Sequence, residues 1–199
     1  LAIGKEHFVQ MPYFERGMQS IAEAETLENN EILKEFSYIF ISNTVKVLGD
    51  MFSPRLQSVV PTLVAIAQDN EMTKQDANDD DEEDDDEDAV GYFNINGNEG
   101  FVNSKKAAIG ALGNMARYCG RDFHPYVPTV FEGLIKEDDG SIWSYHGAIR
   151  SESVSIFPYL VGSVCLKHGF EAPPKVESRQ LPDEVQRHVL SAMIVCVHM

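Results

Sequence analysis

The stretch that decides the fold is residues 120–126, GRDFHPY, because versions of it recur along the chain. Each version has a glycine that ends one helical pattern, an aromatic residue a few positions later, and a start to the next helix that contains Pro or Tyr. Residues 49–54 (GDMFSP) and 4–14 (GKEHFVQMPYF) are two copies, and Gly169-Phe170 is a fainter one. The chain is therefore built from a repeated unit.

The spacing of these copies indicates the kind of repeat. Gly4 and Gly49 are 45 residues apart, Gly49 and Gly120 are 71 apart, and Gly120 and Gly169 are 49 apart. Periods of about 40–47 residues with two helices each are typical of HEAT-type repeats. The middle interval is 26 residues too long, which matches a loop inserted within one repeat. The sequence predicts an all-α fold, an α-solenoid of antiparallel helix pairs.

Apolar periodicity places the helices of each pair. After Pro54, the apolar residues recur at i, i+3, i+4 and i+7, and the same pattern follows Pro125. These are outer helices, predicted at 10–24, 54–68 and 125–136. Their inner partners are apolar over a wider surface and are predicted at 31–48, 103–119 and 141–164. Ser141 is the expected N-cap of the last one, and Gly49 and Gly120 are expected left-handed helix ends.

The predicted organisation has five parts. HEAT repeats occupy 1–69 and 103–168, an acidic flexible loop at 70–102 is inserted within a repeat, a linker covers 169–184, and 185–199 begins a further repeat. A repeat of this kind buries its faces only against its neighbours. We therefore expect the sequence to be a fragment of a longer protein.

Charge is concentrated in one place. The 199 residues have a net charge of −16, and ten consecutive acids contribute −10 of it, which leaves −6 elsewhere. This local acidity disfavours nucleic acid and anionic membrane as partners and favours a protein with a basic surface. The run consists of Asp79, Asp80, Asp81, Glu82, Glu83, Asp84, Asp85, Asp86, Glu87 and Asp88.

The acidic run cannot bury itself, so we expect a solvated loop. A flexible chain of about 33 residues has an end-to-end scale of about 30 Å, and its charges are screened beyond about 8 Å. Such a loop would act late in the approach of a Lys/Arg-rich partner. The alternative is an insert that only keeps the scaffold soluble.

Other chemistries find little support. A calcium loop could be threaded from Asp76 to Glu87, but its sixth position has Asp81 where glycine is needed. The six histidines lack metal-ligand spacing, and no nucleotide-binding or nucleophile motif occurs, so the chain is not expected to be an enzyme. The three cysteines (Cys119, Cys165 and Cys196) lie in apolar helix stretches and are predicted to be buried, reduced thiols.

The order of these elements resembles a known family. The copy at 1–8 (LAIGKEHF), VLGDMF at 47–52, the acidic run, and residues 105–135 follow one another as in the middle of importin-β-type nuclear transport receptors, with the importin β-3 kind the nearest. The resemblance covers roughly residues 1–165. It implies a superhelical receptor, without catalysis or cofactor, that shuttles between cytoplasm and nucleus through nuclear pores.

The resemblance also implies partners. These are cargo proteins with basic localisation signals, such as ribosomal proteins or histones, the small GTPase Ran in its GTP form, and Phe-Gly nucleoporins. The acidic run is the expected contact for Ran or cargo. Candidates on the concave face are Glu35, Asn43, Asn114, Trp143, Tyr145 and Glu152. Two alternatives stay open: a HEAT scaffold or adaptor outside transport, and an acidic binder that resembles a histone chaperone.

Overall fold

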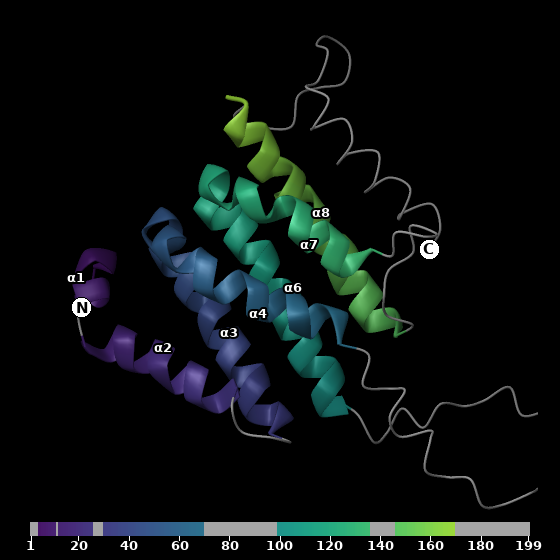
Figure 1. Cartoon of the computed structure of the whole chain (residues 1–199). Helices are drawn as coiled ribbons and strands as arrows, with labels where there is room; N and C mark the ends of the chain where they lie inside the picture. The colour runs from purple at the N-terminus through teal and green to yellow at the C-terminus, as the bar shows by residue number, and fades with distance from the viewer. Residues whose placement is uncertain (1–3, 11, 26–29, 70–98, 136–145, 170–199) are drawn as a thin grey trace, which may run out of the picture.

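The computed structural model describes residues 4–10, 12–25, 30–69, 99–135 and 146–169. Every element in these ranges is helical, and three pairs of helices follow one another along the chain (Figure 1). In chain order the elements are α1 (Lys5–Gln10), α2 (Pro12–Glu25), α3 (Glu31–Leu48), η1 (Gly49–Arg55), α4 (Leu56–Gln68), α6 (Glu99–Cys119), η3 (Gly120–Tyr126), α7 (Val127–Leu134) and α8 (Gly147–Lys167).

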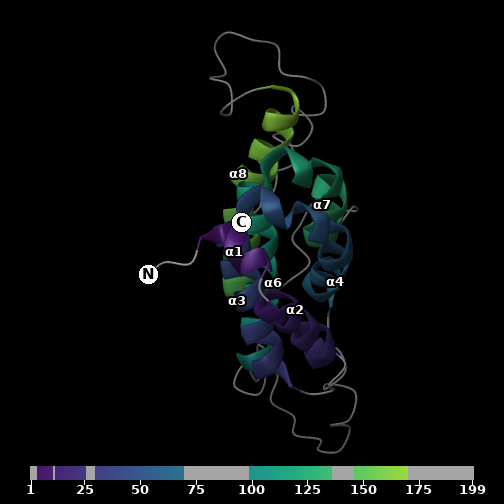
Figure 2. The same cartoon turned by 90° about the vertical axis from the view of Figure 1, so that its left-hand side faces the viewer.

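The helices form two layers. Figure 2 shows α3, α6 and α8 on one side and α2, α4 and α7 on the other. Within the first layer, α6 packs against α3 and α8. Helix α4 of the second layer packs against α6 of the first layer and against α7 beside it. Helix pairs stacked in this way confirm the predicted all-α, HEAT-type solenoid. No helix in the described ranges combines the length and the apolar character that a membrane crossing requires.

One continuous apolar core joins the layers, running from Phe14 in α2 to Cys165 in α8. Helix α6 is at its centre, and a single glycine sets its distance from α8. A Cβ atom on Gly113 would lie 2.5 Å from Cγ2 of Ile156, so only glycine allows the two helices to approach this closely. Cys119 and Cys165 are free and buried, as predicted, and Cys196 lies outside the described residues.

The recurring glycine phrase forms the turn between the inner helix of one repeat and the outer helix of the next. Gly49 and Gly120 have the predicted positive φ angles, 59° and 56°, although the ψ of −129° at Gly49 lies outside the left-handed helical region. At each turn the glycine carbonyl accepts a contact from the next inner helix: from Cys119 Sγ to Gly49 at 3.5 Å and from Ser163 Oγ to Gly120 at 2.7 Å. The repeats are thus tied together at the same backbone position.

The starts of two helices, α6 and α8, differ from the prediction by four residues or more. Helix α6 starts at Glu99 rather than residue 103, because Phe101 and Val102 are buried and extend its apolar face. The expected N-cap at Ser141 is wrong, since α8 starts at Gly147. His146 has an extended backbone, so the helix cannot run through it, and its side chain accepts the Ala148 N–H.

Candidate functional site

The root of the acidic segment lies between α4 and α6. The ten acidic residues themselves, 79–88, lie outside the described residues, but both helices that anchor the segment are described. Asp69 follows the last residue of α4, and its carbonyl accepts a hydrogen bond from Lys105 Nζ of α6 at 3.0 Å. The two helices from which the segment leaves and to which it returns are therefore joined by a direct hydrogen bond.

Lys105 is the unusual residue at this root. It is 2% exposed, and its ammonium lies 5.8 Å from the centre of the Phe101 ring. Burial lowers the pKa of Lys105, and the charge of Asp69 offsets part of this effect. Sequence reasoning missed Lys105 because lysine is rarely buried. Lys105 lies at the i position of an i, i+3, i+7 pattern with the apolar residues Ala108 and Leu112, and this spacing could have indicated that it is on the buried side of the helix.

A second polar contact joins α3 to α6 near the same end. Glu31 accepts hydrogen bonds from Lys34 Nζ at 2.8 Å and from Ser104 Oγ at 2.7 Å. Burial alone would raise the pKa of Glu31, but these two hydrogen bonds and the charge of Lys34 together outweigh it, so the pKa is lowered. Glu31 is therefore held as a carboxylate, and it fixes α6 beside α3 where the acidic segment returns to the stack.

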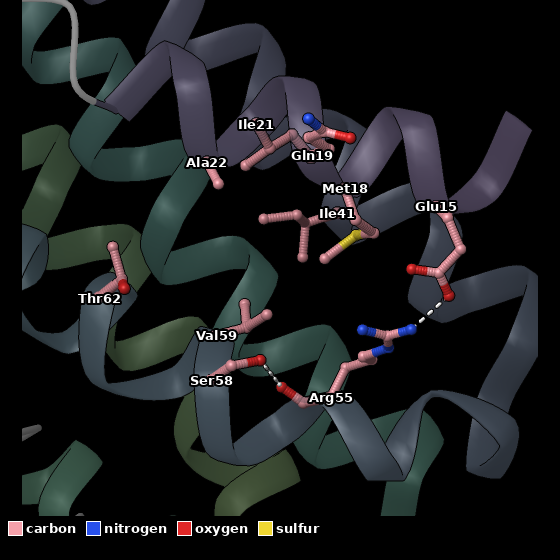
Figure 3. A pocket seen from close by; sticks show the side chains of 10 residues that line it. All are labelled: Glu15, Met18, Gln19, Ile21, Ala22, Ile41, Arg55, Ser58, Val59 and Thr62. Carbon is pink, nitrogen blue, oxygen red and sulfur yellow. Dashed lines mark hydrogen bonds and ion pairs between the residues drawn. The ribbon is translucent and has the colours of Figure 1, made fainter.

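A cavity of about 370 Å³ opens between the outer helices α2 and α4. Figure 3 shows its apolar floor and its polar rim. Met18 and Ile21 of α2, Ile41 of α3 and Val59 of α4 form the floor. The other lining residues are Glu15, Gln19, Ala22, Arg55, Ser58 and Thr62. The sequence could not predict this cavity, because it depends on the gap between two helices from different repeats.

An ion pair closes one end of the cavity. Arg55 of η1 pairs with Glu15 of α2, and its guanidinium lies 5.8 Å from the centre of the Phe14 ring. The Arg55 carbonyl accepts a hydrogen bond from Ser58 Oγ at 3.0 Å. An apolar side chain can enter this space, and the polar groups at the rim can bind the backbone that flanks it.

Four of the predicted concave-face candidates, Glu35, Asn43, Asn114 and Glu152, lie on the inner helices. Asn43 of α3 is exposed, Glu35 of α3 is half-buried, and Glu152 of α8 lies against Gly110 of α6. Asn114 of α6 donates a hydrogen bond to Ser42 Oγ of α3 at 2.7 Å. The side chain of Asn114 thus also joins neighbouring repeats.

Trp143, Tyr145 and the candidate calcium loop at 76–87 lie outside the described residues. Within the described ranges, no cluster of three or more His, Cys, Asp or Glu side chains could hold a metal ion. His124 and His168 meet edge to face with ring centres 6.4 Å apart.

Comparison with known proteins gives one informative match. The chain is 29% identical over 172 residues to a probable importin subunit beta-4 of Schizosaccharomyces pombe. The alignment covers 71% of this chain and 15% of that protein. No family model matches the sequence. The similarity supports the importin-β family in general and does not support the β-3 kind in particular.

Proposed function

We propose that this chain is part of a nuclear transport receptor of the importin-β family. In this role it binds basic cargo and the GTP form of Ran, and it moves between cytoplasm and nucleus. The similarity to a probable importin and the stacked helix pairs support this assignment. The chain spans 15% of that relative's length, so cargo, Ran and pore passage belong to the proposal.

The observation that carries the proposal is the root of the acidic segment. Ten acids lie in a segment that leaves α4 at Asp69, where the Asp69 carbonyl is bound by Lys105 in the second turn of α6, the helix at which the segment ends. A charged tail would sample every direction, whereas this segment is anchored at both ends, on α4 and α6. It can therefore present its charge to a basic partner held on the neighbouring repeats.

Nucleotide-dependent capture of Ran tests the assignment. The full-length product of the gene is immobilised and offered Ran loaded with GTP or with GDP. Preferential capture of the GTP form is expected. Equal failure with both forms contradicts the transport assignment and favours the scaffold.

Neutralising the acidic run tests its role. All ten residues are changed to the matching amides, Asp to Asn and Glu to Gln, so that length and volume are kept. We expect weaker affinity for Ran or for a Lys/Arg-rich cargo, and a smaller dependence of that affinity on salt. A matched control changes Gln57 and Gln68, exposed residues of α4, to Glu. Unchanged affinities with unchanged salt slopes would show that the run is only a solubilising insert.

The histone-chaperone reading predicts a different pattern. Histone binding would be strong, would be lost in the amide variant, and would not respond to Ran.

The cavity between α2 and α4 is the proposed docking place for Phe-Gly nucleoporins. Its apolar floor and polar rim suit an aromatic side chain flanked by extended backbone. Ala22→Trp, at an exposed position of α2 that lines the cavity, should fill it and weaken binding of a Phe-Gly peptide. Ser20→Trp, exposed on the same helix outside the lining, is the control. Equal binding by both variants would place the nucleoporin contact elsewhere.

A further inference from the structure

An exposed arginine on the inner helices is held between two tyrosine rings. The guanidinium carbon of Arg117, in the last turn of α6, lies 5.2 Å from the ring centre of Tyr118 and 5.2 Å from that of Tyr159 in α8. Arg117 is exposed, whereas both tyrosines are half-buried. The rings attract the cation and restrict where it lies, but they do not neutralise it. The N–H groups of Arg117 therefore remain available to an anionic acceptor.

Arg117 has no carboxylate within reach on the two helices that hold it. Helix α6 has one acidic residue, Glu99, and α8 has one, Glu152. Glu152 lies beside Gly110, which is seven residues before Arg117, or about 10 Å along α6. Glu99 is farther away still. The charge of Arg117 is therefore not matched by its own helix or by the neighbouring one.

The preceding repeat has a cation at the same place. The glycines that end α3 and α6 are 71 residues apart, and this offset places Lys46 at the position of Arg117 and Asn43 at that of Asn114. Lys46 is exposed, and its Nζ donates a hydrogen bond to Asn43 Oδ1 at 3.5 Å. In the part of the chain that the structure describes, neither Lys46 nor Arg117 forms an ion pair. Packed helices lie about 8–10 Å apart, so these two cations have about that separation.

The helix dipole explains part of this arrangement. A positive charge in the last turn of a helix interacts favourably with the dipole, and Lys46 and Arg117 are both in last turns. That interaction needs neither a planar guanidinium nor aromatic rings beside it. A guanidinium held against aromatic rings is instead pre-organised to bind both oxygen atoms of one carboxylate.

We propose that Arg117, positioned by Tyr118 and Tyr159, binds a carboxylate of an acidic segment in a partner protein, and that Lys46 binds a second carboxylate of that segment. In the polyproline II conformation, side chains at i and i+3 lie on the same side of the chain, about 9 Å apart. This spacing matches the two cations, so the acids are expected three residues apart. The partner is thus selected by an acidic feature, in addition to the basic surface that the acidic run attracts.

Binding of a defined acidic peptide to the full-length product of the gene tests this proposal. The probe is fluorescein-labelled Pro-Pro-Glu-Pro-Pro-Glu-Pro-Pro, because proline favours polyproline II, and binding is followed by fluorescence anisotropy. We expect saturable binding that weakens about tenfold in Arg117→Gln, as for the loss of a charged hydrogen-bonding partner. Arg16→Gln removes the same charge from an exposed position of α2 and should leave the affinity unchanged. No binding by the wild type, or equal affinity of Arg117→Gln, overturns the proposal.

Conservative variants separate ligand binding from the helix dipole. Arg117→Lys keeps the charge at the end of α6 but loses the planar fork, so the peptide should bind roughly fivefold more weakly while the melting temperature is unchanged. Tyr159→Phe keeps the ring and should keep the affinity, whereas Tyr159→Ala should weaken binding several-fold. Wild-type affinity in Arg117→Lys would contradict the role of the stacked guanidinium.

Two further peptides identify the chemistry of the ligand. A version with Gln in place of both Glu residues should not bind, because its amides are neutral. Lys46→Gln should weaken binding of the two-glutamate peptide about threefold and should not affect a peptide with a single Glu. Binding of a version with phosphoserine at both positions, without binding of the glutamate peptide, would overturn the assignment to a carboxylate.

Discussion

At the scale of single residues, the contact between α6 and α8 depends on one missing side chain. A Cβ atom at Gly113 would lie 2.5 Å from Ile156 Cγ2. Gly113→Ala gains up to about 1 kcal/mol in helix propensity, but overpacking costs about 1–3 kcal/mol. We expect a net loss of about 1 kcal/mol in the free energy of unfolding, measured by urea denaturation.

Gly162 of α8 is the matched control for this prediction. No atom lies within 4 Å of a Cβ placed there, so Gly162→Ala should be neutral or stabilise the chain by up to about 1 kcal/mol. Equal effects of both substitutions would mean that propensity, rather than the close approach to Ile156, governs Gly113.

The buried thiol of Cys119 predicts a pH dependence at the same scale. Burial is the main reason that the pKa of Cys119 is raised from 9.0 to about 11; the hydrogen bond with Ser53 opposes this increase, and the charges of Asp122 and Asp50 add to it. The unfolded thiol loses its proton near pH 9, whereas the folded thiol keeps its proton up to about 11. Its contribution to stability is present below pH 9 and lost as pH rises to 11.

The measurement compares two pH profiles. The wild type should lose on the order of 2 kcal/mol more stability than Cys119→Ala between pH 9 and 11. Lys105 also titrates anomalously, but it is present in both proteins and cancels in the difference. Parallel profiles would show that the thiol is not shielded from water.

At the scale of helices, periodicity predicted most of the architecture. Helix α3 has the predicted bounds, and α4 and α7 lie within the predicted ranges, because apolar residues at i, i+3 and i+4 mark the buried side directly. The start of α6 was missed because Glu99 and Gly100 follow an Asn- and Gly-rich stretch that is typical of a loop. The Lys105–Asp69 contact and the α2–α4 cavity were missed because both depend on how separate helices meet.

The Lys105–Asp69 contact predicts that the acidic segment can be removed. Asp69 contacts a lysine only six residues into α6, about 9 Å along that helix, so the feet of the segment are close. An eight-residue Gly/Ser linker spans up to about 26 Å and can replace residues 70–98. We expect a melting temperature within a few degrees of the wild type and loss of binding to a basic partner.

Lys105→Ala in the otherwise intact chain is the companion variant. It leaves the Asp69 carbonyl without its donor and creates a cavity, so we expect a loss of about 2–3 kcal/mol in stability. Unfolding of the linker variant would contradict the idea that the two feet are held independently of the segment.

At the scale of the whole molecule, stability should fall from the centre of the stack toward α1. Helix α6 packs on α3, α8 and α4, and its buried residues run from Phe101 to Cys119. Helix α2 packs on α1 and α3, with Phe14 and Ile21 in the core. In a stacked-repeat protein each unit is stabilised by its neighbours, so the elements with the fewest packed neighbours should open most easily.

Native-state hydrogen exchange checks this gradient. We expect the α6 amides to exchange only through global unfolding, and the α2 and α1 amides to exchange through local opening several kcal/mol cheaper. Protection of α2 equal to that of α6 in the 199-residue chain would mean that the stack unfolds as one cooperative unit. The continuous apolar core, which runs from Phe14 to Cys165, would then determine stability more than the number of helices that each element packs against.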